Sequence, residues 1–119
     1  MIAQTIDKEA FPELFESALY KRILSMIGTG KEQGTHVIDI CRATDLDNRE
    51  ARRAIETIRR AGVIVCTDCF HGYFYPETMD ELGDYIQQEF HRACSILEIL
   101  QCASEKYMKE HKRGGGENE

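Results

Sequence analysis

The stretch from Leu46 to Pro76 constrains the fold more than any other, because it carries the start and stop signals of one helix. Asp47 is a favourable N-cap, and Glu50 stands three residues later, where its side chain completes a capping box. Gly62 can end the helix, because glycine adopts the left-handed conformation without strain. Between these ends the apolar residues recur at helical spacing and predict one buried stripe: Ala51, Ala54, Ile55, Ile58 and Ala61.

Two short strands are predicted directly after this helix. Val63–Val65 is short and β-branched, and Tyr73–Tyr75 forms a return strand that Pro76 ends. The turn between them runs through Thr67–Gly72. The sequence therefore predicts a helix followed by a β-hairpin.

The face of the helix opposite the apolar stripe is rich in arginine. Its charged residues are Arg49, Arg52, Arg53, Glu56 and Arg60. Arginines that point outward from a helix beside a hairpin are typical of proteins that read DNA. The alternative is a solvated helix face that is stabilised by pairs such as Arg49–Glu56 or Arg52–Glu56.

Length and composition fit one small domain with an appended element. A chain of 119 residues can form one core, but so small a core gains stability from oligomerisation. No stretch is long and apolar enough to cross a membrane, and the first residues do not begin a signal peptide, so we expect a cytoplasmic protein. The odd number of five cysteines argues against a complete disulfide framework.

The charge of the chain is unevenly distributed. Its net value of −6 argues against a general nucleic-acid binder. Yet Arg42–Arg60 contains six arginines against four acidic residues, whereas Glu77–Glu110 contains eight acidic residues against three basic ones. This asymmetry leaves a locally basic helix and predicts weak non-specific affinity for DNA, because few phosphates would be neutralised.

The N-terminal half is predicted to contain two more helices. Residues 1–10 are expected to be flexible, and Phe11–Ile27 forms a core helix that starts beside Pro12. Gly28–Thr35 has three glycines and no apolar residue, so it reads as a loop. Thr35 is expected to cap a short helix that ends near Ala43.

A long C-terminal helix is predicted from Met79 to about Lys112, within a segment 78–112 that begins with Thr78 or Asp80 as the cap. It has a heptad-like seam. The seam residues predicted to form a dimer interface are Ile86, Phe90, Ala93, Leu97, Leu100 and Tyr107.

Between Ala93 and Ala103 this helix is apolar on nearly all sides, so it needs two partners. One is the helix Phe11–Ile27, and the other is the same helix of a second subunit. The alternative is an intramolecular surface. Residues 113–119 are expected to be a disordered tail.

Two motifs carry a resemblance to a known family. The stretch ARRAIETIRRAGVIV, Ala51–Val65, and the closing GYFYP, Gly72–Pro76, resemble winged-helix domains of the biotin-repressor type. The whole chain is also similar to small phage- or prophage-encoded winged-helix proteins. The resemblance implies a mainly α fold with a small β-hairpin, namely a winged helix-turn-helix domain over residues 11–77 and a C-terminal dimerisation helix. Asp45 stands where such turns often have glycine, and it tolerates the left-handed conformation.

These features together predict sequence-specific binding of double-stranded DNA by a homodimer that regulates transcription or replication. Asn48 would pair with adenine, and Arg49 or Arg52 with guanine. The other residues of the predicted DNA site are the phosphate-holding Arg42, Arg53 and Arg60, together with His71. The alternative is a winged helix used for protein interaction or assembly without DNA contact. The net acidity and a hairpin tip without lysine or arginine favour that alternative.

Other chemistry has weaker support in the sequence. Cys66 and Cys69 form a CxxC pair, and His71 follows two residues later. A structural zinc site requires four ligands, however, and no second pair follows at a suitable spacing. The same two cysteines could instead form a reversible disulfide. The chain lacks a phosphate-binding loop, a metalloprotease motif and a nucleophile elbow, so we expect no enzyme, no cofactor and no small-molecule effector.

Overall fold

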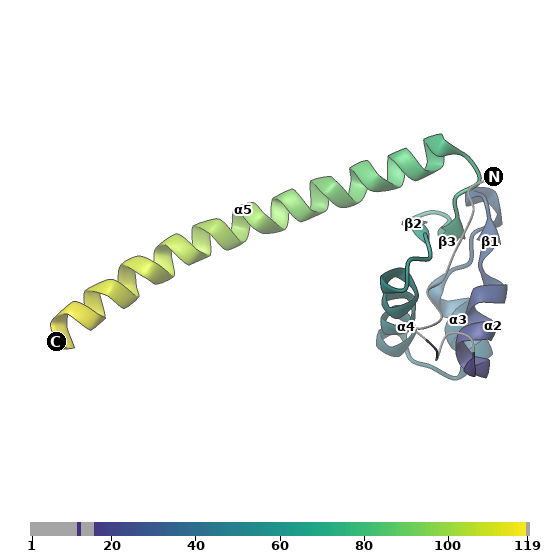
Figure 1. Cartoon of the computed structure of the whole chain (residues 1–119), viewed down its shortest axis with the longest axis horizontal. Helices are drawn as coiled ribbons and strands as arrows, with labels where there is room; N and C mark the ends of the chain where they lie inside the picture. Colours follow the sequence, from purple (N-terminus) through teal and green to yellow (C-terminus); the bar gives the residue numbers. More distant parts are fainter. Residues whose placement is uncertain (1–11, 13–15, 119) are drawn as a thin grey trace. The chain divides into compact units, whose positions relative to one another are not determined.

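The protein is mainly helical with a small three-stranded sheet (Figure 1). The computed structural model describes Pro12 and residues 16–118, with side chains as far as His111. The chain divides into two units after Tyr85. Among the described residues, no helix combines the length and the apolar character that a membrane span requires.

The first described helix, α2 (Ala18–Met26), starts later than the sequence predicted. Ser17 is its N-cap, with extended backbone and a side chain that accepts a hydrogen bond from the Tyr20 amide. One continuous helix over Phe11–Ile27 is therefore wrong, because a serine that caps the helix at this point takes the chain out of helical geometry. The predicted flexible residues 1–10 and the predicted start at Phe11 lie outside the described residues.

The glycine-rich segment after α2 is more regular than the predicted loop. It contains β1 (Gly28–Thr29) and the short 3-10 helix η1 (Lys31–Gln33). Thr35 then pairs with Tyr73 in an antiparallel bridge, and its hydroxyl donates to the Met26 carbonyl at 2.7 Å. The prediction that Thr35 caps the next helix is wrong, because these bonds already engage its side chain and backbone.

The next two helices are joined by three residues. The first, α3 (Val37–Thr44), has His36 as its N-cap and ends at Asp45, whose φ of 58° is left-handed as predicted. The second is α4 (Asn48–Arg60), and its predicted capping box is confirmed: the Glu50 amide donates to Asp47 Oδ1 at 2.8 Å, and the Asp47 amide donates to Glu50 Oε1 at 3.2 Å.

Gly62 ends α4 as predicted, with a φ of 100°. Its amide donates to the Arg59 carbonyl, and the Val63 amide donates to the Ile58 carbonyl. This pair of bonds is the Schellman arrangement, which satisfies the last carbonyls of a helix.

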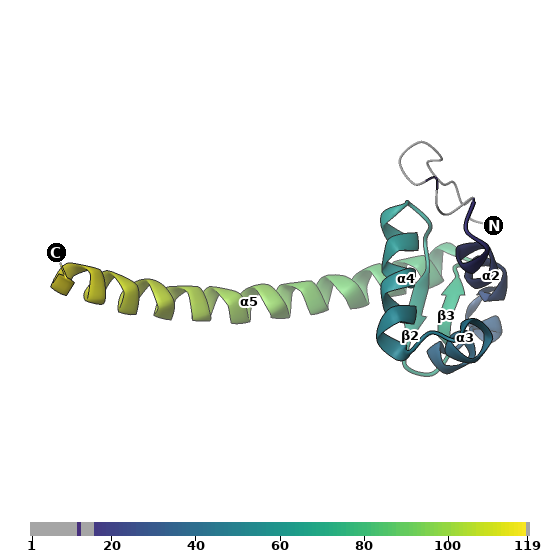
Figure 2. The same cartoon turned by 90° about the horizontal axis from the view of Figure 1, so that it is seen from below.

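The core lies between the three helices and the sheet. The predicted apolar stripe of α4 is buried there, and Ala51, Ile55 and Ile58 have at most 1% exposure. The other buried members of this cluster include Ile23 of α2, Ile40 of α3, Val63, Val65 and Tyr73. Figure 2 shows α4 beside the hairpin that follows it.

The hairpin consists of β2 (Cys66–Asp68) and β3 (Gly72–Tyr75), and β1 pairs in parallel with the other edge of β3. The return strand and its end at Pro76 are confirmed. The first strand was predicted too early, at Val63–Val65. Val63 and Val65 are buried in the core but belong to no strand. Pairing with β3 begins only at Cys66, which lies opposite Phe74.

Gly72 is held where no other residue fits. Its φ is 75°, and an added Cβ would lie 2.5 Å from the Thr35 carbonyl oxygen. We expect Gly72→Ala to lower the free energy of unfolding by about 2–4 kcal/mol, because a backbone oxygen cannot move aside and the conformation is strained. Gly83→Ala is the matched control: nothing lies within 4 Å of its added Cβ in helix α5 (Met79–Asn118), so it should stabilise by about 0.5–1 kcal/mol. Urea denaturation measures both, and equal effects would contradict this account.

The last helix, α5 (Met79–Asn118), begins as predicted with Thr78 as its cap, since the Glu81 amide donates to the Thr78 hydroxyl. Its end differs from the prediction. The helix continues past Lys112 to Asn118, so residues 113–118 do not form the expected disordered tail, and Glu119 lies outside the described residues. Adding residues to an existing helix is much easier than starting one, which lets the helix run into the glycines.

Candidate nucleic-acid interface

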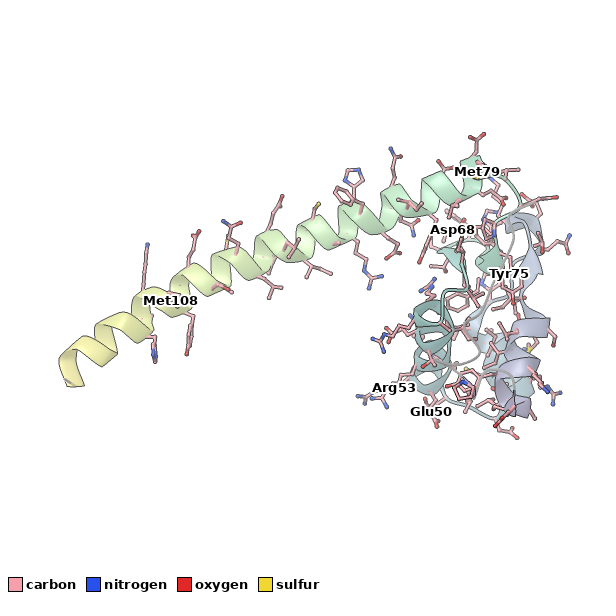
Figure 3. The ribbon with its side chains drawn as sticks, in the orientation of Figure 1. Glu50, Arg53, Asp68, Tyr75, Met79 and Met108 are labelled. Atoms are coloured by element: carbon pink, nitrogen blue, oxygen red, sulfur yellow. The ribbon has the colours of Figure 1, made fainter. Side chains whose placement is uncertain are left out.

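The outer face of α4 presents cations to solvent. Asn48, Arg49, Arg52 and Arg53 are all exposed, and Figure 3 shows Arg53 on the side of α4 that faces away from α2 and α3. Within the described part of the chain, none of these three arginines forms an ion pair. The capping box places the first of them in the opening turn of the helix, where a base-reading side chain would be needed.

The alternative pairs Arg49–Glu56 and Arg52–Glu56 do not form in this structure. Glu56 instead lies 4.0 Å from Arg60, four residues further along the helix. Both partners are largely exposed, so this pair contributes little to stability. Arg60 is thus partly engaged, whereas Arg42 is exposed on the last turn of α3.

Asn48 has a neighbour that the sequence did not indicate. The Cys41 thiol of α3 donates to Asn48 Oδ1 at 3.4 Å. This contact engages the oxygen of the Asn48 side chain and not its Nδ2 amino group. A bidentate bond to adenine requires the oxygen as well, so the Cys41 contact competes with that role.

The side chain of Arg59 turns inward, and the sequence did not indicate this. Its Nε donates to the Val65 carbonyl at 2.9 Å, and its guanidinium carbon lies 5.7 Å from the ring centre of Tyr73 and 5.4 Å from that of Tyr85. Its Nη2 is buried without a hydrogen-bond partner among the described residues. The available signal was its position four residues after Ile55, at the border of the apolar stripe. This guanidinium joins α4, the hairpin and the first turns of α5.

The hairpin tip is held by Asp68. Its Oδ1 accepts the amides of Phe70 and His71 at 2.9 and 2.7 Å, and its Oδ2 lies 2.8 Å from His71 Nδ1. The predicted DNA residue His71 is therefore bound within the tip, and its Nε2 lies 3.9 Å from Glu32. Phe70 is 80% exposed, so the tip presents an aromatic ring to solvent.

Acid is expected to loosen both the tip and the base of α5. Partial desolvation raises the pKa of Asp68, but hydrogen bonds from His71 and Phe70 outweigh it and hold that pKa below 3.8. The Glu81 carboxylate also accepts amides, from Glu77 at 2.8 Å and Lys31 at 3.1 Å, and these outweigh desolvation to hold its pKa below 4.5.

Since both folded pKa values lie below the ordinary ones, each carboxylate stabilises the protein above its ordinary pKa, and this stability is lost as pH falls through the folded value. We expect the free energy of unfolding to decline below about pH 4.5. Asp68→Asn keeps an acceptor but loses the charge, so its urea-denaturation profile should depend less on pH. A profile as steep as that of the wild type would refute the role of Asp68.

The zinc and redox alternatives receive no support from the side-chain geometry. Cys66 is fully buried, and burial raises the pKa of its thiol to about 11, so it remains protonated. Cys69 is exposed and His71 binds Asp68. Nowhere in the described residues do three histidine, cysteine or acidic side chains converge as a metal site would require.

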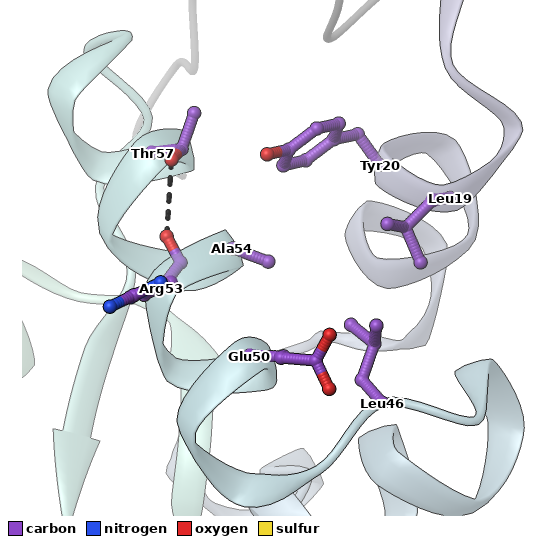
Figure 4. Close-up of a pocket in the computed structure, with 7 residues that line it drawn as sticks. All are labelled: Leu19, Tyr20, Leu46, Glu50, Arg53, Ala54 and Thr57. Atoms are coloured by element: carbon purple, nitrogen blue, oxygen red, sulfur yellow. Dashed lines mark hydrogen bonds between the residues drawn. The ribbon is translucent and has the colours of Figure 1, made fainter.

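A shallow hollow of about 380 Å³ lies between α2 and α4 (Figure 4). Its lining is Leu19, Tyr20, Leu46, Glu50, Arg53, Ala54 and Thr57. In Figure 4 the Arg53 side chain points away from Tyr20, and the Thr57 hydroxyl donates to the Arg53 carbonyl at 3.1 Å. Arg53 therefore stands at the rim of the hollow and remains free to meet a partner on the outer face of α4.

The predicted dimer residues of α5 are exposed within the described part of this helix. Phe90 is 68% exposed, Leu97 62% and Tyr107 63%. Ile86 and Leu100 are more than half exposed, and Ala93 is exposed as well. An apolar row of this length in water favours burial against another helix.

The function is inferred from the side chains of α4 and α5. Comparisons of the chain with protein-family models, with curated proteins and with solved structures found no match.

Proposed function

We propose that the chain is a winged helix-turn-helix protein that binds double-stranded DNA sequence-specifically as a homodimer, in phage or bacterial control of transcription or replication. The observation that supports this most is the outer face of α4, where Arg49, Arg52 and Arg53 are exposed and not ion-paired within the described residues. Guanidinium groups of this kind bind guanine edges and phosphates. Arginines that served only to stabilise the helix through ion pairs would be expected to contact the nearby carboxylates.

In this proposal α4 lies in the major groove with its first turns against base edges. Arg49 and Arg52 contact guanine, while Arg53, Arg60 and Arg42 hold phosphates and fix the register. The turn at Asp45 orients α3 so that it crosses the sugar-phosphate backbone of the DNA. His71 approaches the same DNA backbone from the hairpin. Pairing through α5 joins two such units, so the site on DNA is a palindrome.

A second function is favoured by a specific observation at the hairpin tip. Phe70 is 80% exposed on a turn that Asp68 holds rigid, and the tip has no lysine or arginine. Exposed aromatic residues on rigid turns are typical anchors of protein interfaces. With the net charge of −6, this supports a protein-interaction or assembly module as the alternative.

Selection of bound duplexes from a random library distinguishes the two functions. The wild-type protein should enrich a palindromic motif with half-sites about one helical turn apart. The affinity for this motif should fall steeply with salt, because phosphate contacts release counterions. Enrichment of no motif would reject DNA reading and leave the interaction module.

A further inference from the structure

The middle of α5 carries a second apolar stripe beside the seam. The second stripe consists of Ile96, Ile99 and Ala103. Ile96 is 49% exposed and Ile99 is 69% exposed, so nothing described in this chain covers them. A homodimer formed through the seam alone would leave them in water.

The angle between the two stripes follows from their spacing. Ile96 directly precedes Leu97, and Ile99 directly precedes Leu100, so both isoleucines of the second stripe stand one position before a seam residue. One residue rotates an α-helix by about 100°, and the two stripes therefore point about 100° apart. Neighbours in a square of four helices lie about 90° apart as seen from one helix, against about 60° in a triangle of three. Four helices fit these stripes best.

The pattern of residues also favours copies of the same helix as the occupant. The second stripe lies on the same turns as Leu97 and Leu100, so the two apolar surfaces form one continuous band. Helices of bundles carry a third apolar heptad position next to the seam, whereas two-stranded coiled coils usually carry charges there. Ile96 and Ala103 occupy that third position.

We propose that four copies assemble through α5, with the seam joining two copies and the second stripe joining one pair to the other. This inference rests on the proposed homodimer and extends it. Four copies carry four α4 helices, which are two sets of the proposed DNA-reading pair. The assembly would thus hold two DNA duplexes at once.

Sedimentation velocity of the full chain tests the assembly. The wild type should have the mass of four chains, and Ile96→Gln/Ile99→Gln should have the mass of two, because the seam is intact. Glu98→Gln is the matched control, since Glu98 lies between these residues in sequence and outside both stripes, and it should keep four chains. Two or three chains for the wild type would overturn the inference, and a single chain would overturn the homodimer as well.

DNA bridging tests the consequence with the selected duplex as the probe. A duplex fixed to beads should capture a second, labelled duplex through the wild-type protein. The Ile96→Gln/Ile99→Gln variant should bind either duplex alone and capture at least tenfold less. Bridging that is equal in both would contradict the role of the second stripe. Four chains that bind no duplex would instead reject the proposed function.

Discussion

The Arg49→Gln/Arg53→Gln variant is expected to bind the selected duplex at least about 30-fold more weakly than the wild type. Each good contact of this kind contributes about 1–3 kcal/mol, and 1.4 kcal/mol corresponds to a factor of ten. Both side chains are exposed and form no ion pair in the described structure, so their loss should leave the fold and the assembly intact. A mobility-shift titration measures the affinity.

A matched control separates the position of these charges from their number. Lys21 and Arg22 are exposed on α2, and Lys21→Gln/Arg22→Gln removes the same net charge. This control should bind within a few-fold of the wild type. If both variants lost affinity equally, only the overall charge would matter and α4 would not be the reading helix. Unchanged affinity of Arg49→Gln/Arg53→Gln would reject the interface altogether.

Leu97→Gln/Leu100→Gln is expected to break the seam that joins two chains into a pair. Burying one leucine contributes about 1.5–3 kcal/mol, so four leucines in a pair contribute about 6–12 kcal/mol. The dissociation constant of the seam should therefore rise at least about 10⁴-fold, and sedimentation at micromolar concentration should show at most two chains, held by the second stripe. Glu98→Gln again serves as the control. An unchanged mass would place the contact between chains elsewhere.

The same variant also tests the link between assembly and DNA reading. Without the seam the two reading units are no longer held as a pair, so the affinity for the palindrome should fall to that for a single half-site. Circular dichroism should show that the globular unit, the part of the chain that ends at Tyr85, remains folded, because neither leucine belongs to its buried core. Loss of helical signal from that unit would mean that the substitution had damaged the fold instead.

The sequence predicted the parts of the fold that depend on local signals. The capping box of Asp47 and Glu50, the glycine that ends α4 and the left-handed Asp45 each need only a few neighbouring residues. The sequence did not predict β1, because this strand pairs with Phe74 and Tyr75 far along the chain. It also misplaced β2, because the start of this strand is set by the register that puts Cys66 opposite Phe74. The break at Ser17 was also missed, because an apolar face continued across it.

The features of the candidate interface also fall into two groups, those that local sequence patterns predict and those that depend on the folded structure. Outward arginines on α4 follow from helical periodicity, and their exposure agrees with it. The inward turn of Arg59 depends on two tyrosines that become neighbours only after folding. The contact of Cys41 with Asn48 likewise requires the angle between α3 and α4. Binding of DNA by α4 depends on the DNA sequence as well, and the sequence of the protein does not specify that partner.

Arg59 also makes the globular unit respond unevenly to acid. The contacts of Arg59 with Tyr73 and Tyr85 involve no carboxylate. The hairpin tip depends on the Asp68 carboxylate, which accepts the His71 and Phe70 amides fully only while it is charged. On acidification the tip should therefore open while Arg59 still contacts Tyr73 and the Val65 carbonyl. Amide exchange at low pH would then reach Phe70 and His71, whose amides donate to Asp68, earlier than Gly62, whose amide donates to the Arg59 carbonyl.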